Sequence, residues 1–569
     1  MNSKLATVDY IIFICYFLIV STYGIWIYRR KKKASIDTKD FFLAEGSLTW
    51  WAIGASLIAS NISAEQFIGM SGNGYLVGIG IAAYEWIAAI ALIIVAVWFI
   101  PVYLKNRIFT MPQFLKTRYN ETVALIMAIF WLFLYVLVNL TSILYLGAVA
   151  INNLGGGEYF HAIVIGLALF ALIITLGGMK VIGYTDVIQV VVLIIGGLAT
   201  TYIALTLVSE NFGHGKNIWA GFTSMMNHSP EHFHMMLDKP KPGAPMGEVK
   251  NYLMLPGIAM YFAGQWVVNL NYWGCNQYIT QRALGADLKT ARTGILFAAL
   301  LKIMMPVIVM LPGIAAYVLY QRGMLHTEMA PGGKFNSDNA YSAILGFLPT
   351  GLKGLSVAAL TAAIVASLAG KANSISTIFT LDIYKKYLKS EATERQLVWT
   401  GRLTILVAMI VSIVLTWEDL LGIGGEGGFT FIQKYTGFIS PGIFAMFILG
   451  MFWKRTTGAA AIAGIITGFA LSVIFNNYAP VWFGHENILY TAFEVEREGK
   501  LVWEIPFLIC MGWSFVFTMI VMIGMSLVGP RINPKAFELD TKMFKVTPGT
   551  LALIVTILIL ITLIYVRFW

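Results

Sequence analysis

Runs of about 20 apolar residues recur along the whole chain and limit the folds that it can adopt. A run of this length carries an α-helix across the roughly 30 Å of hydrocarbon in a bilayer. Only 12% of the 569 residues are charged, whereas a soluble surface needs about a quarter. The sequence therefore predicts an all-α integral membrane protein. We place fourteen transmembrane spans at residues 9–28, 48–70, 78–104, 121–151, 161–179, 183–207, 253–281, 293–320, 353–384, 397–416, 427–453, 457–476, 504–528 and 549–568.

The basic residues predict how these spans are inserted. Cytoplasmic loops carry the excess of Lys and Arg in membrane proteins. The first loop is strongly basic between Arg29 and Lys39, and the alternate loops that follow from it hold most of the other Lys and Arg residues. The net charge of +10 therefore reflects insertion into a plasma (inner) membrane, and no nucleic-acid partner is expected. An even number of spans predicts that both termini are extracytoplasmic.

Cysteine and histidine residues give no sign of a disulfide, a resident metal or a cofactor. Cys15, Cys275 and Cys510 all lie in predicted spans, where packing is their simplest role. His228 and His232 are spaced by four residues in the outer segment, but a solvated helix explains this spacing more simply than a metal site. No zinc-protease motif or phosphate-binding loop is present, so we expect no enzyme.

The second span breaks the pattern of an apolar helix. It places Asn61, Ser63, Glu65 and Gln66 within six residues of one another, just before Gly69. At membrane depth each unpaired polar group costs several kcal/mol, and each charge about 2.5 kcal/mol or more. An unwound helix that lines a water-filled cavity accounts for this run. The alternative is that the span ends at residue 60 and the polar residues form an outer loop.

A second interruption falls in the seventh span. Gln265, Asn269, Asn271 and Asn276 lie in an otherwise apolar stretch at 253–281. Two broken helices, each opening a block of about five spans, are typical of transporters that are built from inverted repeats and bind their solute near the midplane. The two broken helices also favour a carrier over an ion channel, which would need a pore ring or a filter loop.

Three further polar features are expected near the same cavity. Tyr84, Glu85 and Trp86 lie in the third span, Asp186 lies near the inner end of the sixth, and aromatic and amide groups occupy 429–433 in the eleventh. Amides and carboxylates can satisfy sugar hydroxyls, which both donate and accept, and aromatic rings pack against the apolar face of a pyranose. This combination indicates a polyhydroxylated solute.

Several of these segments resemble the solute:sodium symporter family, and within it the bacterial sodium/glucose and sodium/galactose cotransporters. The resemblance extends over nearly the whole chain. It implies a LeuT-type five-plus-five inverted repeat with one leading and three trailing helices. The motifs that carry it are ASNISAEQFIGM (59–70), YEW (84–86), YTDVIQ (184–189), YWGCNQ (272–277), QR (281–282) and FTLDIY (379–384).

The implied repeats divide the chain into five parts. Residues 1–46 form the leading helix and the basic cytoplasmic loop, and residues 208–252 form an extracytoplasmic loop. The two five-helix repeats occupy 47–207 and 253–453, and the three trailing helices occupy 454–569.

The resemblance also assigns the residues that contact a sugar. These positions keep the residue types of the family: Asn61, Gln66, Glu85, Asn269, Lys302 and Gln433. The resemblance places Tyr272 as the cytoplasmic gate, and Met70, Tyr84 and Phe429 as the outer gate. Ala88 replaces a Ser of the sugar transporters, so one hydroxyl contact is missing and the preferred sugar is open.

The implied sodium site consists of the carbonyls of Ala59, Ile62 and Ala363 and the hydroxyl of Ser367. Ala366 occupies the place of a second Ser ligand in the relatives. Lys371 is a further departure, one helical turn after Ser367. We expect Lys371 to pair with Asp186, because the implied fold puts both along the sodium exit path.

These residues together predict a secondary active transporter that takes up a neutral, glucose- or galactose-like sugar with sodium by alternating access. Sugar, sodium and the lipid bilayer are the expected partners, with no obligatory protein partner. A symporter for myo-inositol, sialic acid or another solute is one alternative. Because of Ala366 and Lys371, a proton-coupled or uncoupled sugar carrier is another. A membrane sugar sensor is a remote third.

Overall fold

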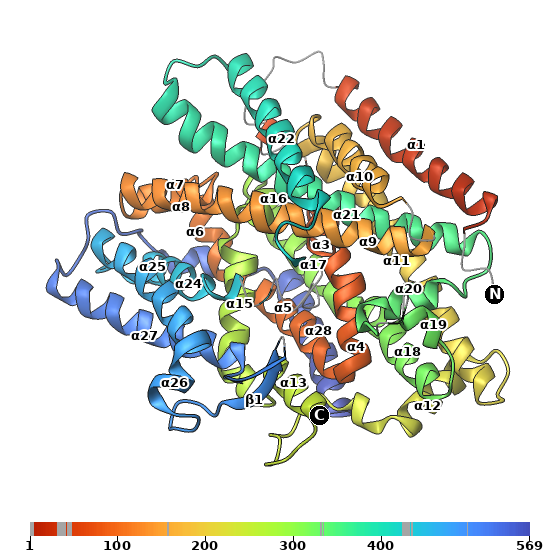
Figure 1. Cartoon of the computed structure of the whole chain (residues 1–569). Coiled ribbons are helices and arrows are strands. Elements are labelled where there is room, and N and C mark those ends of the chain that lie inside the picture. The colour runs from red at the N-terminus through yellow and green to blue at the C-terminus, as the bar shows by residue number, and fades with distance from the viewer. Residues whose placement is uncertain are drawn as a thin grey trace. The chain divides into compact units, whose positions relative to one another are not determined.

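A computed structural model describes residues 5–30, 41–42, 48–155, 159–330, 333, 335–423, 433, 436–497 and 499–569. The described residues are mostly helical, and the chain divides into two compact units, which are described separately below (Figure 1). Both units are assembled from segments that alternate along the sequence. Unit 1 comprises Met1–Ile79, Met127–Phe233 and Gln277–Phe429, and unit 2 comprises Gly80–Ile126, His234–Asn276 and Thr430–Trp569.

Long apolar helices dominate the fold, as the sequence predicts. Within the described residues, ten helices are long and apolar enough to cross a membrane. One of them, Glu65–Lys105, covers the end of the second expected span and the whole of the third. An eleventh candidate is a pair of helices, Met246–Phe262 and Gly264–Cys275, bent by 82° at the second predicted interruption. Two shorter apolar helices, Phe160–Thr175 and Ser440–Phe452, coincide with two further expected spans.

Unit 1 contains the first broken helix and the long helices that pack around it. Helix α11 packs against α21, and α3 packs against α17, α11 and α21. The elements of unit 1 are α1 (Thr7–Arg30), α3 (Trp50–Asn61), the π-helix η1 (Glu65–Met70), α4 (Ser71–Val77), η4 (Leu134–Leu140), α9 (Thr141–Gly155), α10 (Phe160–Thr175), α11 (Met179–Asn211), α12 (Ile218–His228), η5 (Pro230–Phe233), α16 (Gln277–Leu284), α17 (Leu288–Val309), α18 (Leu311–Gln321), α19 (His326–Met329), η7 (Ser337–Asn339), α20 (Ala340–Leu345), α21 (Leu352–Thr377), η8 (Ile378–Leu388) and α22 (Glu394–Trp417).

Unit 2 contains the second bent helix and the last helices of the chain. Helix α15 packs against α5, α24 and α27, and α25 packs against α24 and α27. Two of the boundaries between the units fall within elements, in η2 (Gly78–Ala82) and in α8 (Glu121–Phe133). The elements of unit 2 are α5 (Ala83–Ile94), η3 (Val95–Phe99), α6 (Ile100–Lys105), α7 (Met111–Arg118), α13 (Met246–Met254), α14 (Ala259–Phe262), α15 (Gly264–Cys275), α24 (Ser440–Phe452), α25 (Gly458–Val473), η10 (Ile474–Tyr478), α26 (Ala479–Phe483), β1 (Phe493–Arg497), β2 (Lys500–Glu504), α27 (Phe507–Val528), η11 (Thr541–Phe544) and α28 (Pro548–Phe568).

A short antiparallel hairpin, β1–β2, connects α26 with α27 in unit 2. Its register pairs Phe493 with Glu504 and Arg497 with Lys500. Gly499 lies in the turn with a φ of +75°, a conformation that glycine adopts without steric cost. The buried side chain of Val495 packs against α13, so one face of the hairpin contacts the rest of unit 2.

A carboxylate from α1 caps the helix that carries part of the site. The N–H groups of Gly351 and Gly354, at the start of α21, donate to Oδ1 of Asp9 at 2.7 and 2.9 Å. The first turn of a helix has N–H groups without helical partners, and an acidic oxygen stabilises them. Asp9 therefore fixes the first helix of the chain against the N-terminal end of α21.

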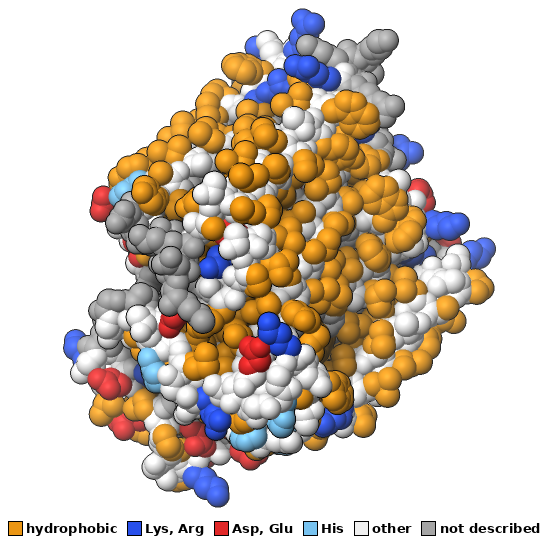
Figure 2. Space-filling model, turned by 90° about the vertical axis from the view of Figure 1, so that its right-hand side faces the viewer, with side chains coloured by type: hydrophobic (Ala, Val, Ile, Leu, Met, Phe, Trp, Pro, Cys, Tyr) orange, Lys and Arg blue, Asp and Glu red, His pale blue; other side chains and the backbone are white. Residues whose placement is uncertain are grey.

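The outer surface of α1 is suited to lipid. Its large apolar side chains are about half exposed, for example Ile14 at 53% and Leu18 at 52%. Figure 2 shows the side of the molecule at the right of Figure 1, where α1 lies, and hydrophobic side chains cover much of this face. A surface of this kind is stable in hydrocarbon and not in water.

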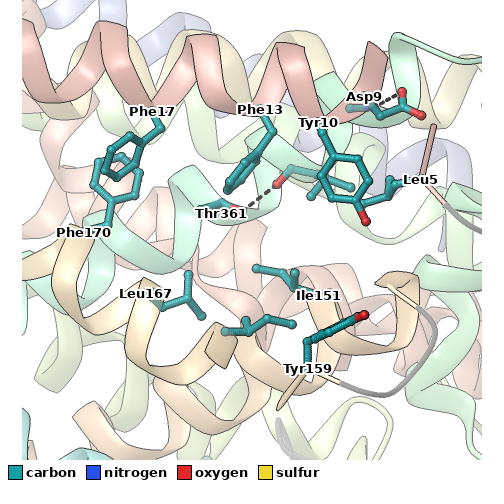
Figure 3. A pocket seen from close by; sticks show the side chains of 14 residues that line it. Leu5, Asp9, Tyr10, Phe13, Phe17, Ile151, Tyr159, Leu167, Phe170 and Thr361 are labelled. Carbon is teal, nitrogen blue, oxygen red and sulfur yellow. Dashed lines mark hydrogen bonds between the residues drawn. The ribbon is translucent and has the colours of Figure 1, made fainter. Parts of the chain in front are cut away.

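A pocket of about 350 Å³ lies between α1, α10 and α21 (Figure 3). Phe17 and Phe170 meet edge to face at its apolar end, with ring centroids 4.5 Å apart, and Asp9 lies at the other end. None of the residues predicted to bind sugar or sodium lines this pocket.

Candidate functional site

The first broken helix forms the centre of the site. Helix α3 ends at Asn61, and Ile62 has an extended backbone with φ −82° and ψ 108°. The helix resumes in η1 at Glu65 and continues through Met70, and every residue between Asn61 and Met70 is buried. The predicted interruption is therefore present. The alternative of an outer loop after residue 60 is wrong, because the polar residues are followed by buried helix.

The side chains of Ser63 and Gln66 accept backbone N–H groups next to the break, in a variant of a capping box. The Ser63 hydroxyl accepts the N–H of Glu65 at 3.2 Å, and the N–H of Ser63 donates to Oε1 of Gln66 at 3.0 Å. The Ser63 hydroxyl also lies 3.1 Å from the same Oε1 atom. A Ser followed three residues later by Gln has the spacing of a capping box, and here the two side chains satisfy N–H groups that the break leaves without helical partners.

The end of α3 presents backbone carbonyl groups to a hydroxyl on α21. The Ser367 hydroxyl lies 3.0 Å from the carbonyl oxygen of Ser60, and 3.4 Å from those of Ala59 and Ile62. Ala363 lies one turn earlier on α21 and is fully buried. Three of the four residues of the expected sodium set therefore meet at one point. Oxygen ligands from an unwound backbone suit a hard monovalent cation.

A buried ion-pair network lies beside the same end of α3. Oδ2 of Asp186 accepts the Ser56 hydroxyl at 2.5 Å and lies 3.8 Å from Arg282. Nε of Arg282 donates to the Ser56 oxygen at 2.7 Å, and its Nη2 group donates to the Ser60 hydroxyl. Gly370 leaves room for this network, because a Cβ atom there would lie 2.5 Å from Nη2 of Arg282, which would have to shift.

The expected ion pair between Lys371 and Asp186 is wrong, because Asp186 pairs with Arg282. Lys371 is only 5% exposed, and its Nζ lies 5.1 Å from the centre of the Tyr278 ring. The acidic group that interacts with it electrostatically is Glu65, in the first turn after the break. A cation–π contact and a buried carboxylate both offset the cost of an ammonium group at membrane depth.

Sequence reasoning did not assign a role to Arg282 or to Glu65. Both lie in segments that resemble the family. The spacing of residues along the chain does not reveal which helix faces another, so it does not predict their partners. The one available signal was charge. Glu65 is an ionisable residue within an apolar span and Arg282 directly follows one, and ionisable residues at membrane depth are functional or paired by default.

The remaining expected ligands and gates divide between the two units. In unit 1, Asn61, Gln66 and Met70 lie at the break and Lys302 lies on α17, and all four are buried. In unit 2, Tyr84 and Glu85 lie at the start of α5, Asn269 and Tyr272 lie on α15, and Gln433 lies before α24. Nδ2 of Asn269 donates to the Gln265 carbonyl at 2.9 Å. Phe429, expected in the outer gate, lies outside the described residues.

Comparisons with known proteins identify the family of the chain. The sequence pattern of the sodium:solute symporter family matches residues 41–468. The sodium/glucose cotransporter of Vibrio parahaemolyticus is 41% identical, over 99% of this chain and 99% of its own length. The sodium/myo-inositol cotransporter 2 of Mus musculus is 32% identical, over 82% of this chain and 69% of its own.

The solved structures show the same fold. A Na+-coupled sialic acid symporter in a substrate-bound outward-open state superposes with a TM-score of 0.74, over 93% of this chain and 99% of its own, at 20% identity. These relatives are sodium-coupled transporters and not enzymes. With a family match over most of its length and a relative similar from end to end, the chain belongs to the sodium:solute symporter family.

Proposed function

We propose that this protein carries a neutral sugar of the glucose or galactose type into the cell together with sodium. The observation that carries this proposal is the 41% identity with a sodium/glucose cotransporter over 99% of both chains. Identity of this extent leaves room for a different sugar, but the retained residue types at the expected sugar contacts support a neutral polyol.

We propose that sodium binds at the break in the first broken helix. The convergence of the Ala59, Ser60 and Ile62 carbonyls on the Ser367 hydroxyl supports this site. The Ser367 hydroxyl lies among these oxygens and would bind the cation together with the carbonyls of Ala59, Ile62 and Ala363. Because most of these ligands are backbone atoms, replacement of one Ser by Ala366 weakens the site without removing it.

The proposed sugar ligands are those that the resemblance assigns. Asn61 and Gln66 flank the break, so sugar and sodium would contact the same short segment of chain. Glu85 disfavours an anionic solute, because two negative charges repel strongly where water is scarce. This argues against the acidic sugar that the sialic acid symporter binds. Myo-inositol, named for the mouse relative, is the nearest second candidate, because it too is neutral and polyhydroxylated. The assigned ligands are Asn61, Gln66, Glu85, Asn269, Lys302 and Gln433.

We further propose fourteen spans in a LeuT-type inverted repeat, with both termini outside a plasma membrane. Transport then proceeds by alternating access, in which sodium stabilises the outward-open arrangement and the loaded protein opens to the cytoplasm. The membrane potential supplies about 2.3 kcal/mol per sodium charge at 100 mV. That corresponds to about fifty-fold sugar accumulation before any sodium gradient is counted.

Uptake by proteoliposomes tests the proposal. The purified full-length protein is reconstituted with an inward gradient of sodium or of choline, and uptake is measured for labelled glucose, galactose, myo-inositol and sialic acid. We expect saturable, sodium-stimulated uptake of glucose or galactose with counterflow. Equal uptake in sodium and choline would refute sodium coupling, and exclusive uptake of inositol or sialic acid would refute the sugar assignment.

A further inference from the structure

One peptide group at the break faces both proposed ligands. The carbonyl oxygen of Ile62 belongs to the proposed sodium set and lies 3.4 Å from the Ser367 hydroxyl. The N–H on the other side of the same peptide bond belongs to Ser63 and donates to Oε1 of Gln66 at 3.0 Å. Gln66 is a proposed sugar ligand. A single rigid plane of atoms thus separates the two sites.

The hydrogen bonds fix which end of the Gln66 amide is turned inward. A backbone N–H can only donate, so the atom that it contacts must be the amide oxygen. The Ser63 hydroxyl adds a second donor to this oxygen at 3.1 Å. Within the described part of the chain, Nε2 of Gln66 makes no hydrogen bond. The Ser63 capping box therefore presents Gln66 to a ligand as an NH2 donor.

The hydroxyl of Ser63 holds this arrangement together. It accepts the N–H of Glu65 at 3.2 Å while it donates to Oε1 of Gln66. Ser63 is 1% exposed, so water does not substitute for either bond. Without the hydroxyl, Oε1 of Gln66 retains one donor, and the side chain can rotate about its flexible bonds.

We propose that the Ile62–Ser63 peptide group couples sodium binding to sugar binding, with Ser63 as the positioning residue for Gln66. A cation on the Ile62 oxygen polarises the peptide group and makes the Ser63 N–H a stronger donor. The stronger bond holds Oε1 of Gln66 and directs Nε2 toward an oxygen of the sugar. This inference rests on the proposed function, and it identifies the atoms through which one ligand favours the other.

Coupling of this kind is reciprocal. If sodium raises the affinity for sugar by some factor, sugar must raise the affinity for sodium by the same factor. Removing the Ser63 hydroxyl should therefore lower both effects together. The same change should leave the sodium affinity measured without sugar nearly unchanged, because the Ser63 hydroxyl is not one of the proposed sodium ligands.

Binding measurements on the full-length protein in nanodiscs test this. Sugar dissociation constants for D-glucose and D-galactose are measured by calorimetry without sodium and with saturating sodium, and the sodium constant is measured without sugar. Ser63→Ala is compared with wild type and with Ser71→Ala. Ser71 is a matched control, because it is fully buried on α4 and its hydroxyl has no hydrogen-bond partner among the described residues.

We expect Ser63→Ala to weaken sugar binding in sodium about five-fold, the effect of one lost neutral hydrogen bond. For each sugar, the ratio of the dissociation constant without sodium to that with sodium should move toward one. The sodium dissociation constant should change less than two-fold. Ser71→Ala should keep the wild-type ratio. If Ser63→Ala does not fold, Ser63→Gly serves in its place, since a non-helical position tolerates glycine.

Three results overturn the inference. A wild-type ratio in the Ser63 variant, with folding verified by sodium binding, shows that the hydroxyl plays no part in coupling. A parallel loss of sodium and sugar affinity shows a merely structural role. Wild-type protein that binds sugar equally with and without sodium overturns the proposed function and this inference with it, and that outcome is visible before any variant is made.

Discussion

The carboxylate of Asp186 lies 3.8 Å from the guanidinium group of Arg282, and both side chains are at most 1% exposed. The Ser56 hydroxyl bridges them, because it donates to Asp186 and accepts from Arg282. The pair therefore ties α3, the half of the broken helix before the break, to α11 and α16. Any movement of α3 away from these helices must break the hydrogen bonds of Ser56 and Ser60 to two buried charged groups, so the network helps to hold one conformation.

Loss of the Asp186 charge should destabilise the protein strongly. Asp186→Asn leaves the buried guanidinium of Arg282 without its negative partner, and breaking a buried pair in this way costs about 3–5 kcal/mol. Denaturation of the protein in detergent, followed by circular dichroism, measures the effect.

The matched control for Asp186→Asn is Glu504→Gln in the hairpin, which removes a carboxylate 2.8 Å from Arg497 in a partly exposed pair. Surface pairs contribute about 0–1 kcal/mol. Equal losses of stability in the two variants would contradict a structural role for the buried pair.

The helices of unit 1 were predictable because bilayer thickness sets the length of a span, and an apolar run of that length can be recognised directly in the sequence. The break at Ile62 was predictable for the same reason, since Asn61 to Gln66 could not be part of an ordinary apolar helix. The partners of the charged residues were not predictable. Whether Lys371 faces Asp186 or Glu65 depends on how α21 is rotated against α3 and α11, and spacing along one helix carries no information on its rotation relative to another.

The β1–β2 hairpin also escaped the sequence analysis. It lies between two apolar spans, where hydropathy gives no signal. Its strands have only five residues each, and their main buried contact is the packing of the Val495 side chain against α13. Short segments of this kind are set by local turn chemistry at Gly499 and by tertiary contacts.

Gly370→Ala should disturb the Arg282 network by steric contact. A Cβ atom at this position would lie 2.5 Å from Nη2 of Arg282 and 2.7 Å from the Ser60 hydroxyl, both far inside contact distance. We expect a lower melting temperature and reduced transport. Gly166→Ala on α10 is the control, because a Cβ atom there meets nothing within 4 Å. Alanine favours a helix over glycine by up to about 1 kcal/mol, so a loss of stability in the control would contradict the steric explanation.

Glu85→Ala and Gln66→Ala should each abolish sugar uptake while the protein still inserts. Both residues are proposed sugar ligands, and a site that loses a hydrogen-bonding group in a water-poor pocket leaves sugar hydroxyls unpaired. Uptake of labelled sugar by proteoliposomes is compared at equal protein content, determined by quantitative blotting. Undiminished uptake in either variant would refute the assigned site.

Lys371 should modify sodium affinity without replacing sodium. The carbonyl ligands at the break do not depend on this side chain, so wild-type uptake should be stimulated by sodium, and Lys371→Met should remain stimulated. The variant should be less stable, because it leaves Glu65 buried without its positive partner, and Oε1 of Glu65 has no hydrogen-bond partner among the described residues. Adding Glu65→Gln should restore part of the lost stability, and this recovery measures the coupling of the pair. If sugar uptake by the wild type did not depend on sodium, and sodium stimulated uptake only in Lys371→Met, the ammonium group of Lys371 would substitute for the cation.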